Sequence, residues 1–501
     1  MIHCDVLVLS PFRRPVFRTA ISPMYPLEEP WDSPPLLIAG EIESAGFEVR
    51  YLPLQNIYTS FDEKEDVPQL KTILSQYKTR IVLFSSDHFI ASRSTATLYG
   101  IRIVSTLIKE KDSLSYIGMT GRLATTVREK LFKLVKNLDF LVVGEAETVI
   151  GKVISKIMTG GLSDIIKHEN VISKEQINSQ ELNKVISAKI EDLDKMALPA
   201  YHLIPPILTL FERIRKRPLI NIPFSIRTSL GCKFKCKFCA GIPNWQDYRK
   251  KKNYRVAAEI DYLFKNLSGI ARLAFFEDEI FTLDENHVRQ VSELLIQRNI
   301  KLDGIYTHSS LLTSAVAELL LPMTNKVFMG LDNADDNILK KMGKAQSLDS
   351  VLNAVKIARD ANLKVHLEWI IGTPDETIDS LITSLNAIFN LLITGTVDSI
   401  NSYIFCPHPG TEYEKKQAYY QMKIRENFEF MQESGGFPAS AHLHLTRNQI
   451  FSAYLMSQIV IAEAIQSRKH NGHSVEARRP NRLALHQIFK QISCRDVTHY
   501  D

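Results

Sequence analysis

The 501-residue sequence is poor in cysteine, with six in all, and this scarcity excludes a disulfide-stabilised secreted scaffold. It also lacks a strong charge of either sign, and a net charge of +5 is too small for this length to favour nucleic acid or a membrane surface. No signal-peptide layout precedes Pro11, because Asp5 interrupts the apolar stretch. No uninterrupted apolar run reaches membrane-spanning length. We therefore predict a cytoplasmic protein with no membrane span and no nucleic-acid partner.

Compact apolar runs alternate with helical segments through the first 150 residues. Such runs are typical of parallel strands that are buried on both faces. The predicted strands are Cys4–Ser10, Phe47–Leu52, Arg80–Ser86, Ser115–Gly118 and Phe140–Glu145, with helices at 36–46 and 94–109 between them. Strand–helix alternation at this spacing predicts an α/β, doubly wound (Rossmann-like) domain.

Half of the cysteines lie in one short loop: Cys232, Cys236 and Cys239 fall within eight residues. A structural zinc needs four ligands, and no further Cys or His follows until His287, nor precedes the loop more closely than His202. Three thiolates without a fourth suit a [4Fe–4S] cluster that leaves one iron open. The plainer alternative is three unrelated buried cysteines.

This loop, with Phe238 just before the last cysteine, resembles the cluster-binding loop of the radical-SAM superfamily. In that family S-adenosylmethionine chelates the open iron, and an electron from the cluster cleaves it to a 5′-deoxyadenosyl radical. The resemblance implies a [4Fe–4S] cluster on Cys232, Cys236 and Cys239, with Phe238 at the cofactor site. It also implies a reductant such as flavodoxin or ferredoxin.

Two acidic stretches resemble the family's S-adenosylmethionine-binding motifs. Glu277, Asp278 and Glu279 end a predicted strand, where acids can accept hydrogen bonds from the ammonium group of the cofactor. Asp332 and Asn333 replace the Glu-Ser pair that the family carries after a glycine. Both replacements keep side chains that can form hydrogen bonds with a ribose or a carboxylate.

Further motifs complete the resemblance. Gly372 begins a Gly-Thr-Pro-Asp-Glu-Thr stretch like the one that runs beside the adenine, and Cys406–Thr411 resembles the end of a last barrel strand. His308 stands where the family usually has arginine, so it is a candidate catalytic acid or base that faces the substrate. The alternative is a structural histidine. These motifs at strand ends imply a partial (β/α)6 barrel.

A doubly wound domain before such a barrel resembles the cobalamin-binding domain of cobalamin-dependent radical-SAM enzymes. Pro34–Arg50 and Val142–Glu147 carry the likeness, whereas the loop Gly118–Thr125 lacks one glycine and the histidine often found there. A corrin must lie flat on the carboxyl edge of the sheet, where small residues leave room. The residues expected there are Ser85, Ser86, Gly118 and Gly121.

The resemblance implies four segments. They are residues 1–160 (cobalamin-binding-like domain), 161–220 (linker), 221–415 (radical-SAM partial barrel) and 416–501 (helical C-terminal region with a polar tail).

The resemblance also implies an enzyme that methylates an unactivated carbon or phosphorus centre through a 5′-deoxyadenosyl radical and methylcobalamin. The substrate can be a small molecule, a lipid or a peptide. Two alternatives stay open: a cyclase, oxidase or rearrangement enzyme of the same architecture, with or without cobalamin, and an iron–sulfur electron carrier or redox sensor.

Overall fold

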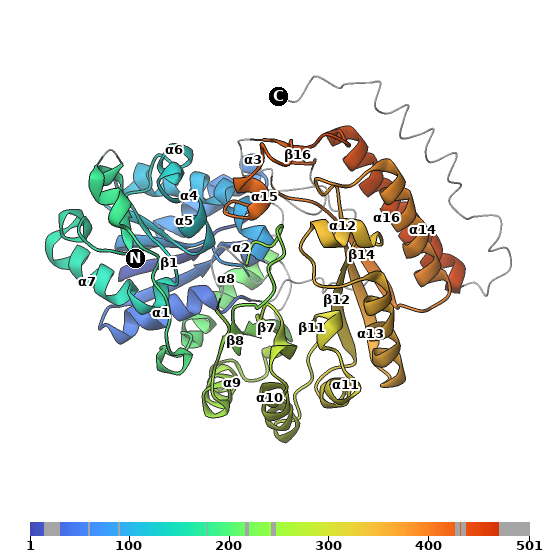
Figure 1. The fold of residues 1–501 in the computed structure, drawn as a ribbon. Coiled ribbons are helices and arrows are strands. Elements are labelled where there is room, and N and C mark those ends of the chain that lie inside the picture. Colours follow the sequence, from blue (N-terminus) through green and yellow to red (C-terminus); the bar gives the residue numbers. More distant parts are fainter. Residues whose placement is uncertain are drawn as a thin grey trace. The chain divides into compact units, whose positions relative to one another are not determined.

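The computed structural model describes residues 1–14, 31–58, 61–88, 91–177, 179–215, 220–241, 247–425, 431 and 437–469. The chain divides into two compact units (Figure 1). Within the described ranges, the first unit holds residues 1–14, 31–230 and 247–277, and the second holds residues 231–241 and 278–469. Each unit is described by itself below.

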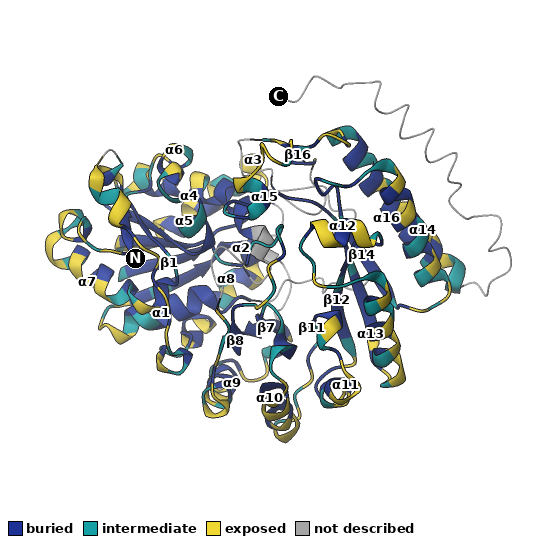
Figure 2. Cartoon of the chain, viewed as in Figure 1, coloured by how far each residue is buried: buried dark blue, intermediate teal, exposed yellow. Residues whose placement is uncertain are grey.

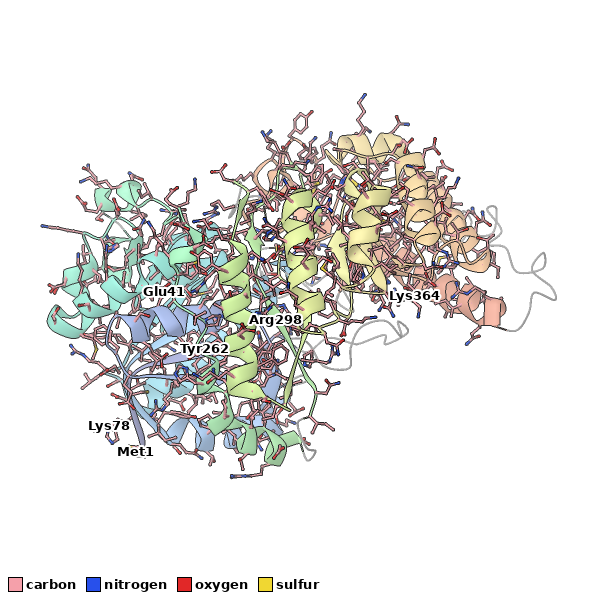
Figure 3. All side chains as sticks on the ribbon, turned by 90° about the horizontal axis from the view of Figure 1, so that it is seen from below. Met1, Glu41, Lys78, Tyr262, Arg298 and Lys364 are labelled. Atoms are coloured by element: carbon pink, nitrogen blue, oxygen red, sulfur yellow. The ribbon has the colours of Figure 1, made fainter. Side chains whose placement is uncertain are left out.

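The first unit is built on a six-stranded sheet in the order β2-β1-β3-β4-β5-β6, parallel except for β6. Its strands are β1 (Ile2–Ser10), β2 (Val49–Pro53), β3 (Tyr77–Ser85), β4 (Tyr116–Thr120), β5 (Phe140–Val142) and β6 (Val171–Ser173). The register runs from Ile2 opposite Tyr77 to Leu9 opposite Phe84. Figure 3 labels Met1 and Lys78 together where β1 and β3 begin. The predicted doubly wound sheet is confirmed.

Helices follow the parallel strands, as the alternating pattern predicts. They are α1 (Pro34–Ser44), α2 (Leu54–Ile57), α3 (Glu63–Ser75), α4 (Leu98–Lys111), α5 (Arg122–Thr126), α6 (Leu131–Leu134) and α7 (Ile150–Gly160). Proline stands at the first position of α1, where its missing N–H costs nothing. Asp62 caps α3 by accepting from the backbone N–H of Lys64 at 2.8 Å. Figure 2 shows the buried faces of these helices along the sheet.

The segment expected as a linker contributes a strand to this sheet. The short apolar run Val171–Ser173 forms β6, antiparallel to β5, and Gly144 bridges to Ala188. This strand was not predicted, because the surrounding sequence is polar and a run of three residues is too short to show a period. The helix α8 (Pro205–Arg215) then precedes the strand β7.

Strands expected in the barrel belong partly to the first unit. β7 (Ile222–Ile226) and β10 (Ala271–Phe276) pair in parallel, β8 (Ser229–Leu230) pairs with β9 (Arg249–Lys250), and α9 (Asn253–Leu267) connects β9 to β10. The backbone N–H of Trp31 donates to the carbonyl of Pro223 at 2.9 Å, and the Trp31 ring packs on Phe224 at 5.5 Å. These contacts tie β7 to the N-terminal part of the chain.

The second unit contains a four-stranded parallel sheet in the order β11-β12-β13-β14. Its strands are β11 (Ile305–Thr307), β12 (Lys326–Asp332), β13 (Lys364–Ile371) and β14 (Ser399–Ile404), with a small hairpin of β15 (Lys423–Ile424) and β16 (Ser440–Ala441). Its helices are α10 (Glu285–Gln297), α11 (Ser314–Leu320), α12 (Asp336–Lys341), α13 (Leu348–Asp360), α14 (Ile378–Ile393), α15 (Glu412–Lys415) and α16 (Arg447–Lys469). Asp284 caps α10 by accepting from the backbone N–H of His287 at 2.9 Å.

The last helix, α16, bears on the prediction that no segment of the chain spans a membrane. Arg447–Arg468 is long and apolar enough to cross a bilayer by length and composition. However, α16 packs along α14 and β14, and Gln458 Nε2 donates to Ser402 Oγ of β14 at 2.7 Å. Arg468 donates to the carbonyl of Val397 at 2.9 Å. One side of α16 is thus packed within the second unit, while Leu455 and Ile459 are exposed.

Candidate active site

The cysteine loop starts where the chain leaves β8. Gly231 has φ +93°, a conformation that glycine adopts without strain, and its N–H donates to Glu279 Oε2 at 3.1 Å. Cys236 is buried, while Cys232 and Cys239 are half-buried, and all three are free thiols. Burial, together with the neighbouring thiols, raises the pKa of Cys232 to about 11 and of Cys236 to about 12. A cationic group bound by the loop would favour the thiolate form that metal ligation requires.

The residue types on this loop suit a cluster. Among the described residues, no group of three His, Cys, Asp or Glu side chains is placed to hold one metal ion. The ligands of an iron–sulfur cluster bind different irons, so they surround the group and do not meet at a point. Three cysteines on one loop therefore suit a [4Fe–4S] cluster held by Cys232, Cys236 and Cys239.

Two segments of the second unit hold the cysteine loop in place. The N–H of Lys237 donates to the carbonyl of Met342 at 3.0 Å, and the N–H of Tyr413 donates to the carbonyl of Lys237 at 3.4 Å. Phe238 packs against a buried cluster formed by Phe405, Tyr413 and Met422. Phe238 thus anchors the loop, and its predicted contact with a cofactor stays a prediction.

The three predicted acids after β10 have different surroundings. Glu277 accepts from the Ser33 N–H and hydroxyl, both at 2.6 Å, and from the Ser225 hydroxyl at 2.7 Å. Both of its oxygens therefore bind groups of the first unit. Glu279 belongs to the second unit and lies near Cys232, whose pKa it raises. Asp278, which stands between Glu277 and Glu279 in the sequence, is buried. Glu279 is the acid that the structure brings to the cysteine loop.

Asp332 forms an ion pair that sequence reasoning missed. Its carboxylate lies 2.5 Å from Nζ of Lys344, and both side chains are nearly buried. Asp332 has φ +57°, which a residue other than glycine rarely adopts. The signal in the sequence is the Gly343-Lys344 pair that follows α12, because a glycine there ends the helix and directs the next side chain.

Asn333 and Gly372 meet at a buried carboxylate. Asn333 Nδ2 donates to Glu376 at 2.7 Å, and the N–H of Gly372 donates to the other oxygen of Glu376 at 2.6 Å. Burial raises the pKa of Glu376 to about 8, although these hydrogen bonds act against the rise. The ends of β12 and β13 are thereby joined, which fixes the Gly372 turn at φ +89°.

His308 is buried and stacks on Phe234 of the cysteine loop, with ring centroids 4.0 Å apart. Its Nδ1 accepts from the N–H of Ser310 at 3.2 Å, so the proton of the neutral ring sits on Nε2, which has no partner among the described residues. Burial lowers the pKa of His308 to about 3, with Lys344 and Lys233 adding to the effect. His308 is thus neutral at physiological pH, where it can donate a hydrogen bond but cannot serve as a cationic acid.

The predicted cobalamin residues lie in the first unit. Ser85 ends β3 with a buried hydroxyl that has no partner among the described residues, and Ser86 donates to the carbonyl of Thr120 at 2.8 Å. Gly121 has φ +94°, and a Cβ there would lie 2.8 Å from the Ser86 hydroxyl. Gly118 lies inside β4, where a Cβ would meet the Phe140 ring, so packing alone explains this glycine.

Glu147, which ends the predicted Val142–Glu147 stretch, has a partner that the sequence did not reveal. Glu147 follows β5 and lies 3.8 Å from Arg227, which lies 3.8 Å from Glu277 on its other side. Burial raises the pKa of Glu147 to about 7, although Arg227 lowers it. One arginine directly before the cysteine loop thus links two buried acids of the first unit.

Comparisons with known proteins agree with this site. Residues 226–388 match the model of the Radical SAM superfamily. An uncharacterized methyltransferase of Pyrococcus horikoshii is 25% identical over 66% of this chain and 68% of its own length. An anaerobic magnesium-protoporphyrin IX monomethyl ester cyclase of Rubrivivax gelatinosus is 24% identical over 61% of this chain, which spans only about half (54%) of that relative.

The fold is shared with a solved structure. The radical S-adenosylmethionine methyltransferase TsrM from Kitasatospora setae, with cobalamin and a [4Fe-4S] cluster bound, matches 98% of this chain and 99% of its own with a TM-score of 0.63. The identity is 14%, so the likeness is one of fold. The chain carries a domain of the Radical SAM superfamily and is a radical SAM enzyme, whose domain implies a [4Fe–4S] cluster and S-adenosylmethionine.

Proposed function

We propose that the chain is a cobalamin-dependent radical SAM methyltransferase that methylates an unactivated carbon or phosphorus centre of a small molecule, lipid or peptide. The observation that carries the proposal is the doubly wound sheet of the first unit, which precedes the cluster loop in the chain. TsrM has this fold over nearly its whole length and carries cobalamin. When bound, cobalamin would supply the methyl group, while the cluster would cleave S-adenosylmethionine to the radical that activates the substrate.

Residues at the carboxyl edge of the sheet support a ligand there. Ligands of doubly wound domains bind outside the carboxyl ends of the strands. The unpartnered Ser85 hydroxyl lies at that edge, and a buried hydroxyl without a partner costs about 1–3 kcal/mol. A polar group on a bound cofactor would remove this cost. Ser86, which follows β3, donates to the carbonyl of Thr120 at the end of the neighbouring strand β4, next to Gly121.

The second candidate is a cyclase of the same architecture. The Rubrivivax relative is a cyclase and is nearly as similar in sequence as the methyltransferase from Pyrococcus. Both candidates use the same cluster and S-adenosylmethionine, and a cyclase of this architecture can occur with or without cobalamin. Only the absence of cobalamin would therefore separate them directly; if cobalamin binds, the products formed from S-adenosylmethionine do so.

The test is reconstitution of cluster-loaded protein with hydroxocobalamin, followed by desalting and a visible spectrum. Wild-type protein should keep the corrin absorption, Ser85→Leu should lose it because the added bulk fills the sheet edge, and Ser85→Ala should retain less than wild type. Ser75→Leu is the matched control, since Ser75 is an exposed residue that ends α3 just before β3 begins. A Gly121 substitution would not be diagnostic, because its backbone conformation strains any other residue.

A colourless wild-type protein with an intact cluster would remove cobalamin from the reaction. That result would favour the cyclase or oxidase alternative. Equal cobalamin retention by wild type and both Ser85 variants would contradict the proposed position of the corrin.

A further inference from the structure

Lys344 is a cation held in a nearly buried position of the second unit. Its side chain is 11% exposed, and its Nζ lies 2.5 Å from Oδ2 of Asp332. Burial lowers the pKa of a lysine, but Asp332 and the thiols of Cys236 and Cys239 outweigh that effect and raise the pKa of Lys344 above its ordinary value. The ammonium is therefore charged at every physiological pH.

The backbone around this ion pair is shaped to accommodate it. A Cβ at Gly330 would lie 3.0 Å from Nζ of Lys344 and 2.9 Å from the Asp332 carboxylate, so a larger residue there would displace the two charged groups. The register of β12 against β13 shifts between Gly330 and Asp332, and Asp332 adopts φ +57°. Such a conformation is unfavourable for a residue other than glycine and persists only where the surrounding contacts hold it in place.

The same lysine adjoins the cysteine loop. Met342, two residues earlier, accepts from the N–H of Lys237, and a Cβ at Gly343 would lie 3.1 Å from the carbonyl oxygen of Lys235. The residues on both sides of Cys236 thus contact the two residues that precede Lys344, which places this ammonium beside the loop that would bind the cluster.

We propose that Lys344 raises the reduction potential of the cluster and that Asp332 is the counter-charge that limits the rise. The potential of an iron–sulfur cluster depends on the net charge around it. Reduction adds one negative charge, so a fixed cation beside the ligating cysteines stabilises the reduced form and an anion beside that cation offsets it. The inference rests on the cluster that the radical SAM domain implies and not on cobalamin.

The two members of the pair predict shifts of opposite sign. Cluster-loaded proteins would be titrated with a chemical reductant under anaerobic conditions, without S-adenosylmethionine, and the reduced cluster counted by electron paramagnetic resonance. Lys344→Met should lower the midpoint potential, Asp332→Asn should raise it, and the double variant should fall between them. Lys344→Arg keeps the charge and should stay near wild type. A tenfold change in the ratio of reduced to oxidised cluster corresponds to 59 mV for one electron.

A purely structural ion pair would give a different pattern, because breaking it from either side would disturb the loop in the same way. Shifts of the same sign in Lys344→Met and Asp332→Asn, or no shift in either, would therefore overturn the proposal. If Lys344→Met fails to bind iron, Asp332→Asn still decides, since a potential at or below that of wild type contradicts the inference. A wild-type protein without iron would refute the cluster itself.

Discussion

At the scale of single residues, burial decides the chemistry of the histidines in the second unit. His308, His366 and His442 are all buried, and burial lowers the pKa of each, to about 3, 3 and 4. Only His308 adjoins the cysteine loop, through Phe234. The other two serve the packing of the unit: Nδ1 of His366 pairs with the Ser399 hydroxyl at 2.6 Å across β13 and β14.

Because burial lowers the pKa of these histidines, each of them should lower the free energy of unfolding of the protein in acid. The unfolded chain takes up protons below pH 6.5 while the folded histidines stay neutral, so stability is complete above pH 6.5 and is lost as the pH falls toward the folded pKa values. Between the unfolded and the folded pKa, each histidine should lower the free energy of unfolding by about 1.4 kcal/mol for every pH unit. Glu147 and Glu376, whose pKa burial raises to about 7 and 8, act in the opposite direction, because their folded forms bind protons more tightly than the unfolded chain does. Urea unfolding between pH 7.5 and 5.5 measures the net slope, and His366→Gln should reduce the destabilisation by acid by up to about 1.4 kcal/mol per pH unit. The exposed His3→Gln is the control, and an equal slope in wild type and His366→Gln would contradict the assignment.

At the scale of elements, the end of α12 positions the cysteine loop. Gly343 has φ +70° and ends the helix, and the two residues beside it carry the contact to Lys237 and the ion pair to Asp332. A helix that stops at this glycine therefore places both a hydrogen-bond acceptor and a cation beside the loop.

This arrangement predicts that Gly343→Ala lowers iron binding. The variant carries the strain of a left-handed backbone, about 1–2 kcal/mol, and also crowds the carbonyl of Lys235 at 3.1 Å. Gly269→Ala is a matched control, because Gly269 has φ +73° and open space around its Cβ position. Thermal unfolding should show a similar loss in both variants, while iron content after reconstitution should fall only in Gly343→Ala. Equal iron content in the two would show that the crowding does not reach the loop.

At the scale of the whole molecule, the features that could be predicted from the sequence are those with a regular pattern of apolar residues or a fixed spacing of functional residues. Long apolar strands such as β1 and β3 gave the doubly wound sheet, and the spacing of the three cysteines gave the cluster loop. The ion pair of Lys344 was missed, because the Gly343-Lys344 pair does not by itself identify the partner, which depends on a register shift and on the left-handed backbone of Asp332. The pairing of Glu277 with Ser33 likewise joins residues 244 positions apart, which no local pattern reveals.

The last prediction uses the complete enzyme to separate the three functions that the sequence left open. Reduced, cluster-loaded protein should cleave S-adenosylmethionine to 5′-deoxyadenosine, and Cys236→Ala should abolish this because it removes a cluster ligand. Cys406→Ala is the control, since Cys406 is buried outside the cysteine loop and should not change iron content. With cobalamin present, a methyltransferase should also form S-adenosylhomocysteine, whereas a cyclase or oxidase should form 5′-deoxyadenosine alone; both products are measured by liquid chromatography with mass spectrometry. A protein that accepts electrons but forms neither product would be an electron carrier, and the proposed function would be wrong.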